Sequence, residues 1–337
     1  MEVVQQLDEG LWKDCVDRQP QSNIFHTPEM HQVFSRAEGH RPQLWAAIED
    51  GRLLALFLPV LVTLKDGLLR PLTTRAVTYG SVLCAANAEG QQALARLLRT
   101  YKGEVKGSPL FTELRNLSDL SAVQPILQDN GFVHEGHLNY LIDLQRPTEE
   151  IWGSLHRNVR SNVRKARRMG VVVEEIASLE KVPVVYQVLT EVYEHIHVPL
   201  APASLFEAAF EILHPRGMIK FFVARVEDTN IGVAIRLLCK DTIYAWYAGA
   251  ARDYAAYKAN DLLNWHVLEW GAQNGFKCFD FGGAGKPDQD YGPRKFKAKF
   301  NGRLVNYGRD ICVHHPRLLH VSQWGYEVYR RYHSGAG

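Results

Sequence analysis

The feature of this sequence that most constrains its fold is a pattern of apolar segments that occurs twice. In the first half, two apolar runs flank Asp50 and Gly51, an arrangement typical of a β-hairpin. In each half, such a hairpin precedes a segment with helical apolar spacing and then another strand. Hairpin, helix and strand are expected at 44–63, 91–101 and 110–114, and again at 221–238, 257–273 and 277–282. The repeated order indicates an internal duplication.

The length of 337 residues suits two domains better than one core. Hydrophobic residues make up 46% and charged residues 23% of the chain, which is typical of a globular protein. We expect an α/β (α+β) fold of two tandem domains, each a mixed, mostly antiparallel sheet flanked by helices. Domain 1 is predicted over 1–147 and domain 2 over 148–312. One active site is expected, in domain 2, because residues 111–115 replace in the first half the glycine cluster of the second.

Several function classes are disfavoured by composition. The net charge of +2 requires any nucleic-acid partner to bind a local patch. The 5 cysteines are scattered without a CxxC pair, which fits reduced thiols in a cytosolic protein better than disulfides or zinc. The longest apolar run, 53–64, is shorter than the about 20 residues that span a bilayer. We predict a cytoplasmic protein without stable membrane insertion, either free or peripheral at the inner face of the membrane.

A basic helix is expected over 148–169, capped by Thr148 and ended by Gly170. An apolar stripe runs along one side of this helix, and cations crowd the opposite side. The acids at i+4 that a solubilising helix usually carries are missing there. These cations are Arg157, Arg160, Arg164, Lys165, Arg167 and Arg168. The side is either a solvated face favoured by the helix dipole or a binding surface for nucleotide phosphates or an RNA backbone. Arg160 and Arg164, in mid-helix, are the strongest candidates.

A glycine cluster ends the last strand of the repeat, in the order Gly282-Gly283-Ala284-Gly285-Lys286-Pro287. A phosphate-binding loop is excluded because Pro287 stands where Ser or Thr must follow the lysine. The dinucleotide fingerprint also fails, because no third glycine and helix follow. The cluster is therefore either a tight turn after a buried strand or a loop at which the backbone approaches a ligand.

A run of lysines and phenylalanines follows the glycine cluster. Phe296 and Phe300 share one face whether the run is a helix or a strand, so we expect both in the core. Lys297, between them, is the cation expected to be drawn inward, whereas Lys295 and Lys299 are expected in solvent.

Other reactive residue types show no arrangement typical of a metal site or of covalent catalysis. His195 and His197 either line a substrate cleft or lie at the surface, and no metal site is predicted from them. The chain has no GxSxG and no catalytic Cys/His pattern. An acyl transfer here would therefore proceed by direct attack of an amine, without a cofactor.

Three motifs resemble the Fem-type aminoacyltransferases and the related GNAT-like proteins with two fused acetyltransferase-type domains. They are Phe25-His26-Thr27-Pro28, the helix end Arg164-Lys165-Ala166 before Gly170-Val171, and Phe279-Asp280-Phe281-Gly282-Gly283 followed by Phe296-Lys297. The resemblance implies two tandem GNAT-like domains, with the tail 313–337 packed back on domain 1. It also implies transfer of an amino acid from aminoacyl-tRNA to an amine of a peptidoglycan precursor, with the acceptor near the domain junction and Lys297 near the reacting ester.

Two departures from related patterns concern the substrates. The lysine that helps Fem-type enzymes to hold a UDP-sugar acceptor has no counterpart in residues 32–35, Gln-Val-Phe-Ser. A coenzyme A enzyme would carry [Q/R]-x-x-G-x-[G/A] before its long helix to bind pyrophosphate through backbone N–H groups. Residues 252–257 read Arg-Asp-Tyr-Ala-Ala-Tyr instead, which argues against ordinary acyl-CoA binding.

Our hypothesis is an N-acyltransferase that moves an aminoacyl group from aminoacyl-tRNA to a small-molecule or lipid-linked amine of cell-wall synthesis, with effects on cell shape. Lys297 is expected to stabilise the oxyanion, and Asp280 or Tyr247 to steer the amine. The expected substrate-binding residues are Arg160, Arg164, Gly282, Gly283, Lys286, Tyr291 and Phe296. Two alternatives remain open: an acyl-CoA-dependent N-acyltransferase of polysaccharide synthesis, and a non-catalytic RNA-binding protein that uses the basic helix.

Overall fold

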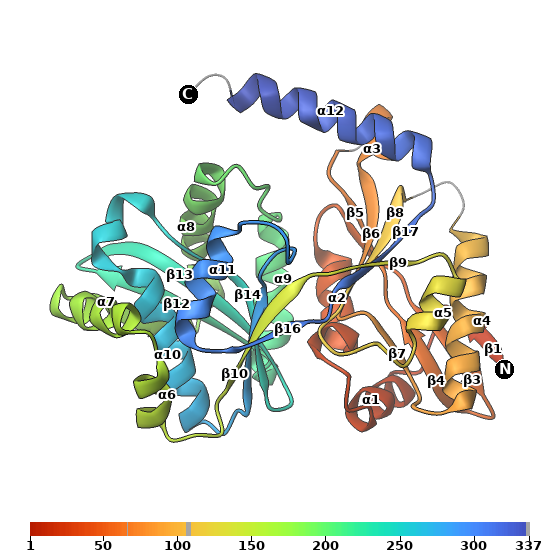
Figure 1. Ribbon diagram of the computed structural model, residues 1–337, viewed down its shortest axis with the longest axis horizontal. Coiled ribbons are helices and arrows are strands. Elements are labelled where there is room, and N and C mark those ends of the chain that lie inside the picture. Colours follow the sequence, from red (N-terminus) through yellow and green to blue (C-terminus); the bar gives the residue numbers. More distant parts are fainter. Residues whose placement is uncertain (66, 106–108, 335–337) are drawn as a thin grey trace. The chain divides into compact units, whose positions relative to one another are not determined.

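The computed structural model describes residues 1–65, 67–105 and 109–334, with side chains up to residue 325. The chain forms two compact units (Figure 1). Unit 1 comprises Met1–Gly136 and Tyr307–Gly337, and unit 2 comprises His137–Asn306. Among the described residues, no helix combines the length and apolar character needed to cross a membrane.

Unit 1 has two sheets with strand orders β1-β3-β4-β7 and β2-β5-β6-β8-β17-β9. Its strands are β1 (Glu2–Val4), β2 (His40–Pro42), β3 (Trp45–Glu49), β4 (Arg52–Phe57), β5 (Val60–Thr63), β6 (Thr74–Tyr79), β7 (Val82–Cys84), β8 (Phe111–Arg115), β9 (Val133–Glu135) and β17 (Arg309–Val313). Its helices are α1 (Glu9–Arg18), η1 (Ile24–His26), α2 (Pro28–Arg36), η2 (Gly67–Leu69), α3 (Arg70–Thr73), α4 (Ala88–Glu104), α5 (Gln124–Asp129) and α12 (Pro316–Ser334).

Local sequence chemistry explains several elements of unit 1. The hairpin β3–β4 turns at Asp50 and Gly51, whose φ angles of 49° and 72° are those that a two-residue turn requires. Helix α2 begins as predicted, because the Thr27 side chain accepts a hydrogen bond from the backbone N–H of Met30 and Pro28 occupies the first turn. The apolar stripe of α4, which includes Leu94 and Leu98, is buried against the sheet.

Unit 2 is built on one sheet with the strand order β11-β12-β13-β14-β15-β10-β16. Its strands are β10 (Leu138–Asp143), β11 (Val172–Glu175), β12 (Ile219–Val226), β13 (Thr229–Cys239), β14 (Thr242–Ala250), β15 (Cys278–Gly283) and β16 (Arg303–Asn306). Its helices are α6 (Thr148–Ser154), α7 (Arg157–Arg168), η3 (Leu179–Lys181), α8 (Val182–His195), α9 (Ala203–Leu213), η4 (His214–Arg216), η5 (Arg252–Tyr257), α10 (Ala259–Gln273), α11 (Gly292–Lys297) and η6 (Ala298–Phe300).

Both faces of the unit 2 sheet are covered by helices, which is why its central strands are mainly apolar. Phe222 contacts Trp270 of α10 on one face, whereas its neighbour Phe221 contacts Phe210 of α9 on the other. This alternation follows from the period of two along a strand. The mixed sheets flanked by helices confirm the expected fold class.

The division of the chain differs from the predicted boundaries at 147 and 312. Strand β10 belongs to unit 2, because its two edges pair with β15 and β16. Strand β17 belongs to unit 1, where it pairs with β8 and β9. A strand joins the sheet that has a free edge for it. The apolar periodicity of the strand does not show which sheet that is.

The predicted single helix over 148–169 is two helices, α6 and α7. Leu155 and His156 between them have ψ angles of 145° and 142° and are therefore extended. The side chain of His156 accepts a hydrogen bond from the backbone N–H of Asn158. The backbone N–H of His156 donates a hydrogen bond to the carbonyl of Lys299. A cap and a tertiary hydrogen bond thus replace the continuous helix.

The run of lysines and phenylalanines is helical, over α11 and η6. Phe296 and Phe300 pack together with their ring centroids 5.2 Å apart. Phe300 is fully buried and Phe296 partly so, against the unit 2 core, which confirms the predicted role of both in packing.

Candidate active site

The candidate site begins where two parallel strands of unit 2 separate. Strands β14 and β15 pair only from Thr242 to Tyr244, which lie opposite Cys278 to Asp280. Both strands continue beyond that point, to Ala250 and Gly283. The parallel pair of unit 1, β6 and β8, stays joined through Tyr79 and Arg115, at the ends of both strands. Of these two parallel pairs, only the one in unit 2 therefore opens an edge of peptide groups.

Lys297 occupies the end of β15 after the strands have parted. Its Nζ donates hydrogen bonds to the carbonyls of Phe281, Gly282 and Gly283, at 2.6, 3.0 and 2.9 Å. It also lies 5.3 Å from the centroid of the Phe281 ring. Gly282 has a φ of 73°, a left-handed conformation that costs a residue with a Cβ. This turn lets successive carbonyls converge on one ammonium group.

A second cation of α11 holds the loop that follows. Arg294 donates to the carbonyls of Ala284 and Pro287, at 2.8 and 3.0 Å, and also to that of Lys286. A phosphate-binding loop turns its N–H groups toward an anion, whereas this loop turns carbonyl oxygens toward cations. The glycine cluster is therefore suited to receive positively charged or N–H-donating groups.

Asp280 is buried, with 3% of its surface exposed, and does not reach the open edge. Its Oδ1 accepts hydrogen bonds from Nδ2 of Asn139 and from the N–H of Gly282, both at 2.8 Å. Burial raises the pKa of Asp280, while these two hydrogen bonds and the charge of Lys297 oppose that shift. In this geometry the carboxylate positions the Gly282 turn. That Asp280 steers an incoming amine stays a prediction.

The charge of Lys297 depends on its neighbours. Burial, and to a lesser degree Arg236, lower the pKa of Lys297 to about 8, and Asp280 opposes that shift. The ammonium form still dominates at pH 7 by about ten to one. It is also the form that three acceptor carbonyls require. At neutral pH Lys297 is thus a cation and not a general base.

Arg236 is a buried cation beneath this site. Its Nη2 donates to Oδ1 of Asn264 at 3.0 Å, and its guanidinium lies 5.6 Å from the centroid of the Phe279 ring. In the part of the chain that the structure describes, no carboxylate forms an ion pair with it, and its buried Nε lacks a hydrogen-bond partner. Burial lowers the pKa of Arg236 to about 9, so it stays charged. Arg236 therefore adds positive potential around Lys297.

Tyr247 and Tyr291 belong to an aromatic group on one side of β14. The ring of Tyr247 lies 4.8 Å from Phe206, 5.0 Å from Trp246 and 6.0 Å from Tyr193. Burial and the nearby Tyr291 raise the pKa of Tyr193 to about 12. Tyr193 is thus near both predicted tyrosines, and its own hydroxyl is neutral at physiological pH.

Three other predicted site residues have mainly structural contacts. Phe296 packs against Phe281 and Phe300. Lys286 supplies its carbonyl to Arg294. His195 interacts through Nε2 with Nη1 of Arg252 at 2.8 Å, and no group of metal-binding side chains is found among the described residues.

The basic helix α7 begins next to the Lys297 segment, through the hydrogen bond from the N–H of His156 to the carbonyl of Lys299 at 2.9 Å. Arg167 pairs with Glu269, and the guanidinium of Arg164 lies 5.5 Å from the centroid of the Trp152 ring. Among the described residues, Arg160 and Arg164 have no ion pair with an acid. Their charges therefore remain available to an external anion.

The segment at the start of α10 carries a carboxylate in the first turn of each of its two helices, η5 and α10. Residues 252–257 form η5, and Lys258, with a φ of 58°, precedes the first residue of α10. Asp253 lies in the first turn of η5, and the buried Asp261 lies in the first turn of α10. Carboxylates at a helix N-terminus compete with any anion that would bind there. Residues 252–257, which lack the glycines of the coenzyme A motif, thus form a short 3-10 helix.

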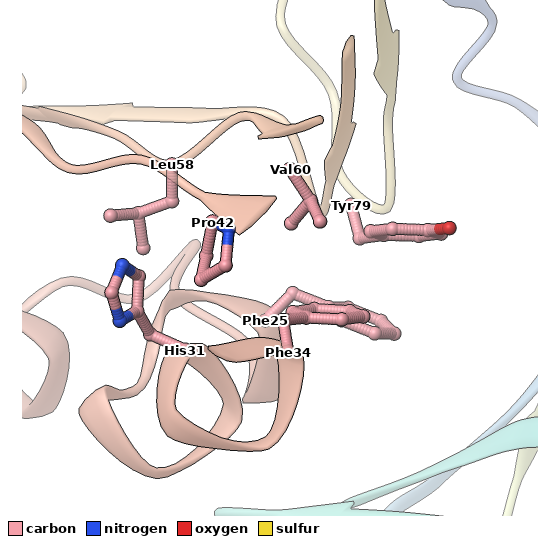
Figure 2. Close-up of a pocket in the computed structure, with 7 residues that line it drawn as sticks. All are labelled: Phe25, His31, Phe34, Pro42, Leu58, Val60 and Tyr79. Atoms are coloured by element: carbon pink, nitrogen blue, oxygen red, sulfur yellow. The ribbon is translucent and has the colours of Figure 1, made fainter. Parts of the chain in front are cut away.

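Unit 1 contains a small cavity between the start of α2 and the sheet (Figure 2). Its lining is largely apolar and aromatic: Phe25, His31, Phe34, Pro42, Leu58, Val60 and Tyr79. Phe34 and Tyr79 are stacked with centroids 5.3 Å apart, and Arg115 lies over Tyr79. Burial lowers the pKa of His31, so its imidazole is neutral at pH 7. This cavity therefore offers aromatic packing beside residues 32–35, which contain no lysine.

The sequence did not identify Arg236, Asn139 or Arg294 as parts of the site. Arg236 lies within a mainly apolar strand. A charged residue at such a position could have indicated a buried cation of the site. Arg294 stands in the run of basic residues, but its carbonyl partners depend on the fold of the loop.

The comparisons with known proteins agree with this fold. Residues 153–297 match the family described as "Acetyltransferase (GNAT) domain". The solved structure of FemX is similar over 95% of this chain and 99% of that chain, with a TM-score of 0.72 and 14% identity. No curated protein sequence matches the chain.

Two further structures share the fold. A C-terminal domain of a putative lysylphosphatidylglycerol synthetase from Agrobacterium fabrum has a TM-score of 0.59 and 14% identity, over 95% of each chain. A tandem GNAT protein from the clavulanic acid biosynthesis pathway has a TM-score of 0.58 and 11% identity, over 94% of this chain and 99% of that chain. The expected resemblance to Fem-type and tandem GNAT-like proteins is confirmed at the level of the fold, and the acetyltransferase domain matched over residues 153–297 supports an acyltransferase.

Proposed function

We propose that the protein transfers an aminoacyl group from aminoacyl-tRNA to the amine of a cell-envelope precursor, in the cytoplasm. The observation that carries this proposal is that the backbone hydrogen bond from His156 to Lys299 joins the start of α7 to the Lys297 segment. Among the described residues, Arg160 and Arg164 of this helix have no ion pair with an acid. A polyanionic donor held by Arg160 and Arg164 would present its ester to the open β14–β15 edge. The resemblance to the FemX fold is consistent with this donor.

The reaction requires a neutral amine to attack the ester carbonyl carbon. A C–N bond forms, the ester C–O bond breaks, and the amine proton passes to the departing ribose oxygen, leaving an amide and a free hydroxyl. The carbonyls of Phe281, Gly282 and Gly283 are acceptors for the N–H groups of the amine. Lys297 supplies positive charge for the oxyanion, and one of its present hydrogen bonds is exchanged for that contact when the substrate binds.

The acceptor is proposed to be an amine on a lipid-linked or soluble peptidoglycan precursor. Residues 32–35 contain no lysine, and Phe34 of this segment stacks on Tyr79. We therefore propose that this acceptor is recognised through its peptide part and an apolar contact, with no diphosphate clamp on α2.

The decisive experiment measures transfer of a labelled amino acid from charged tRNA to amine-bearing envelope precursors. The variant Arg160→Glu/Arg164→Glu should raise KM for the tRNA at least tenfold and leave kcat nearly unchanged. Arg96→Glu/Arg99→Glu, which changes exposed arginines of α4, is the charge-matched control. Turnover with acetyl-CoA in place of charged tRNA would overturn the donor assignment in favour of the acyl-CoA alternative. Binding of tRNA without any transfer would instead support the RNA-binding alternative.

A further inference from the structure

Unit 1 exposes an unusual amount of apolar surface on two neighbouring segments. On the segment around η2, Leu68 is 99% exposed, Leu64 57% and Leu69 49%. On α12, Trp324 is 66% exposed, Val321 49% and Leu318 40%. We call these six residues the apolar surface. Large apolar side chains gathered in this way mark an interaction site more often than scattered single residues do.

The two segments are held side by side by contacts within unit 1. The hydroxyl of Ser322 donates to the carbonyl of Leu72 at 2.6 Å, and α12 lies along α3 (Figure 1). Leu319 and Ser322 are half-buried on this inner side of α12. Leu318 and Val321 are one turn apart and exposed, so the helix presents an apolar stripe that its own unit does not cover.

Positive charge surrounds the apolar surface. In sequence, segments 64–75 and 313–334 carry six Lys or Arg residues against two acids: Lys65, Arg70, Arg75, Arg317, Arg330 and Arg331 against Asp66 and Glu327. Asp66 and the side chains of Glu327, Arg330 and Arg331 lie outside the described part of the structure. Arg70 and Arg317 are both exposed. A partner that fits this surface offers an apolar region to the leucines and tryptophan and negative charge to the neighbouring basic residues.

We propose that this surface docks on an anionic lipid bilayer, with the axis of α12 parallel to the membrane. A helix with leucine and tryptophan on one side and arginine beside them is suited to the interface between headgroups and acyl chains. Tryptophan favours that interface, and each arginine near an anionic surface strengthens binding roughly fivefold.

Other occupants fit the charge less well. Two copies of the surface facing each other would place Arg70 and Arg317 against like charges. A nucleic acid would neutralise the arginines but would leave Leu68 and Val321 without an apolar partner. The inference does not rest on the acyl-transfer proposal, because membrane binding is measured without turnover.

The test uses flotation of the full chain with vesicles of phosphatidylcholine alone or mixed with phosphatidylglycerol. The protein should float with the mixed vesicles and not with the neutral ones. Leu68→Ser/Trp324→Ser should weaken binding at least tenfold, whereas Val133→Ser, which changes a valine that is 65% exposed elsewhere in unit 1, should not. Because all three residues are exposed, the folded structure should survive, as circular dichroism would show.

The charge requirement is tested in the same assay. Arg70→Glu/Arg317→Glu should weaken binding at least tenfold, and the control Arg96→Glu/Arg99→Glu should not. Equal losses in these two variants would mean general charge attraction and would overturn the proposal. The proposal would also be overturned if the protein did not bind mixed vesicles, or if only Arg160→Glu/Arg164→Glu abolished binding. Concentration-dependent dimers abolished by Leu68→Ser/Trp324→Ser would assign the surface to a second copy instead.

Discussion

Replacement of Lys297 by methionine tests whether the glycine loop is built around this ammonium group. Methionine keeps the length and apolar stem of the side chain but removes the donor to three carbonyls, those of Phe281, Gly282 and Gly283. The turn at Gly282 would then have to find other donors or open toward water. Lys297→Met should therefore loosen the end of β15 as well as abolish transfer.

The magnitude follows from the contacts that are lost. Hydrogen bonds to a charged group contribute about 1.5–3 kcal/mol each, and a buried acceptor left unpaired costs about 1–3 kcal/mol. Lys297 is only partly buried, so water replaces part of the loss. We expect unfolding of unit 2 to become easier by about 2–4 kcal/mol in total, on the order of one or two such interactions.

The measurement is urea unfolding combined with hydrogen exchange of residues 281–300. Lys295→Met is the matched control, because Lys295 belongs to the same helix but pairs only with Asp290, and both side chains are at least 70% exposed. Faster exchange in that segment is expected for Lys297→Met only. Equal stability of the two variants, with unchanged exchange at Gly282 to Gly285, would refute the assignment of Lys297 as the centre of this loop.

Three further predictions concern the same region. Transfer should decline as pH rises through about 8, the folded-state pKa of Lys297, and Lys297→Arg should remove this decline if it keeps activity; a pH–rate profile checks both. The folded-state pKa of Lys297 lies below the unfolded value of 10.5, so the unfolded chain binds more protons between about pH 8 and pH 10.5. The contribution of Lys297 to the free energy of unfolding should therefore increase as pH rises through this range, and urea titrations at several pH values measure it. Asp280→Asn should keep the hydrogen bond at Oδ1 but shift the alkaline decline to lower pH, because Asp280 raises the pKa of Lys297; an unmoved profile would contradict this coupling. Gly282→Ala should cost about 1–2 kcal/mol of stability because of its positive φ, whereas Gly292→Ala, with open space around its Cβ, should cost little in the same unfolding assay.

Sequence patterns located the elements of the site but not its contacts. The segment after β15 was identified from glycines and lysines, and Lys297 was singled out because it stands between two core phenylalanines. The surroundings of Asp280 were not predicted, because a sequence does not show that Asn139, 141 residues away, hydrogen-bonds to this buried carboxylate. Arg294 was missed for the same reason, since its partners are backbone carbonyls.

The sequence by itself determined what depends on neighbours along the chain. The hairpin at Asp50-Gly51, the capped start of α2 and the turn at Gly282 follow from local backbone preferences. The tertiary structure decided which edges the strands join. It placed β10 in unit 2 and β17 in unit 1, and it let β14 and β15 part after Tyr244. Pairing between distant strands depends on which edges remain free once the sheets assemble, and this long-range competition leaves no periodic trace in the sequence.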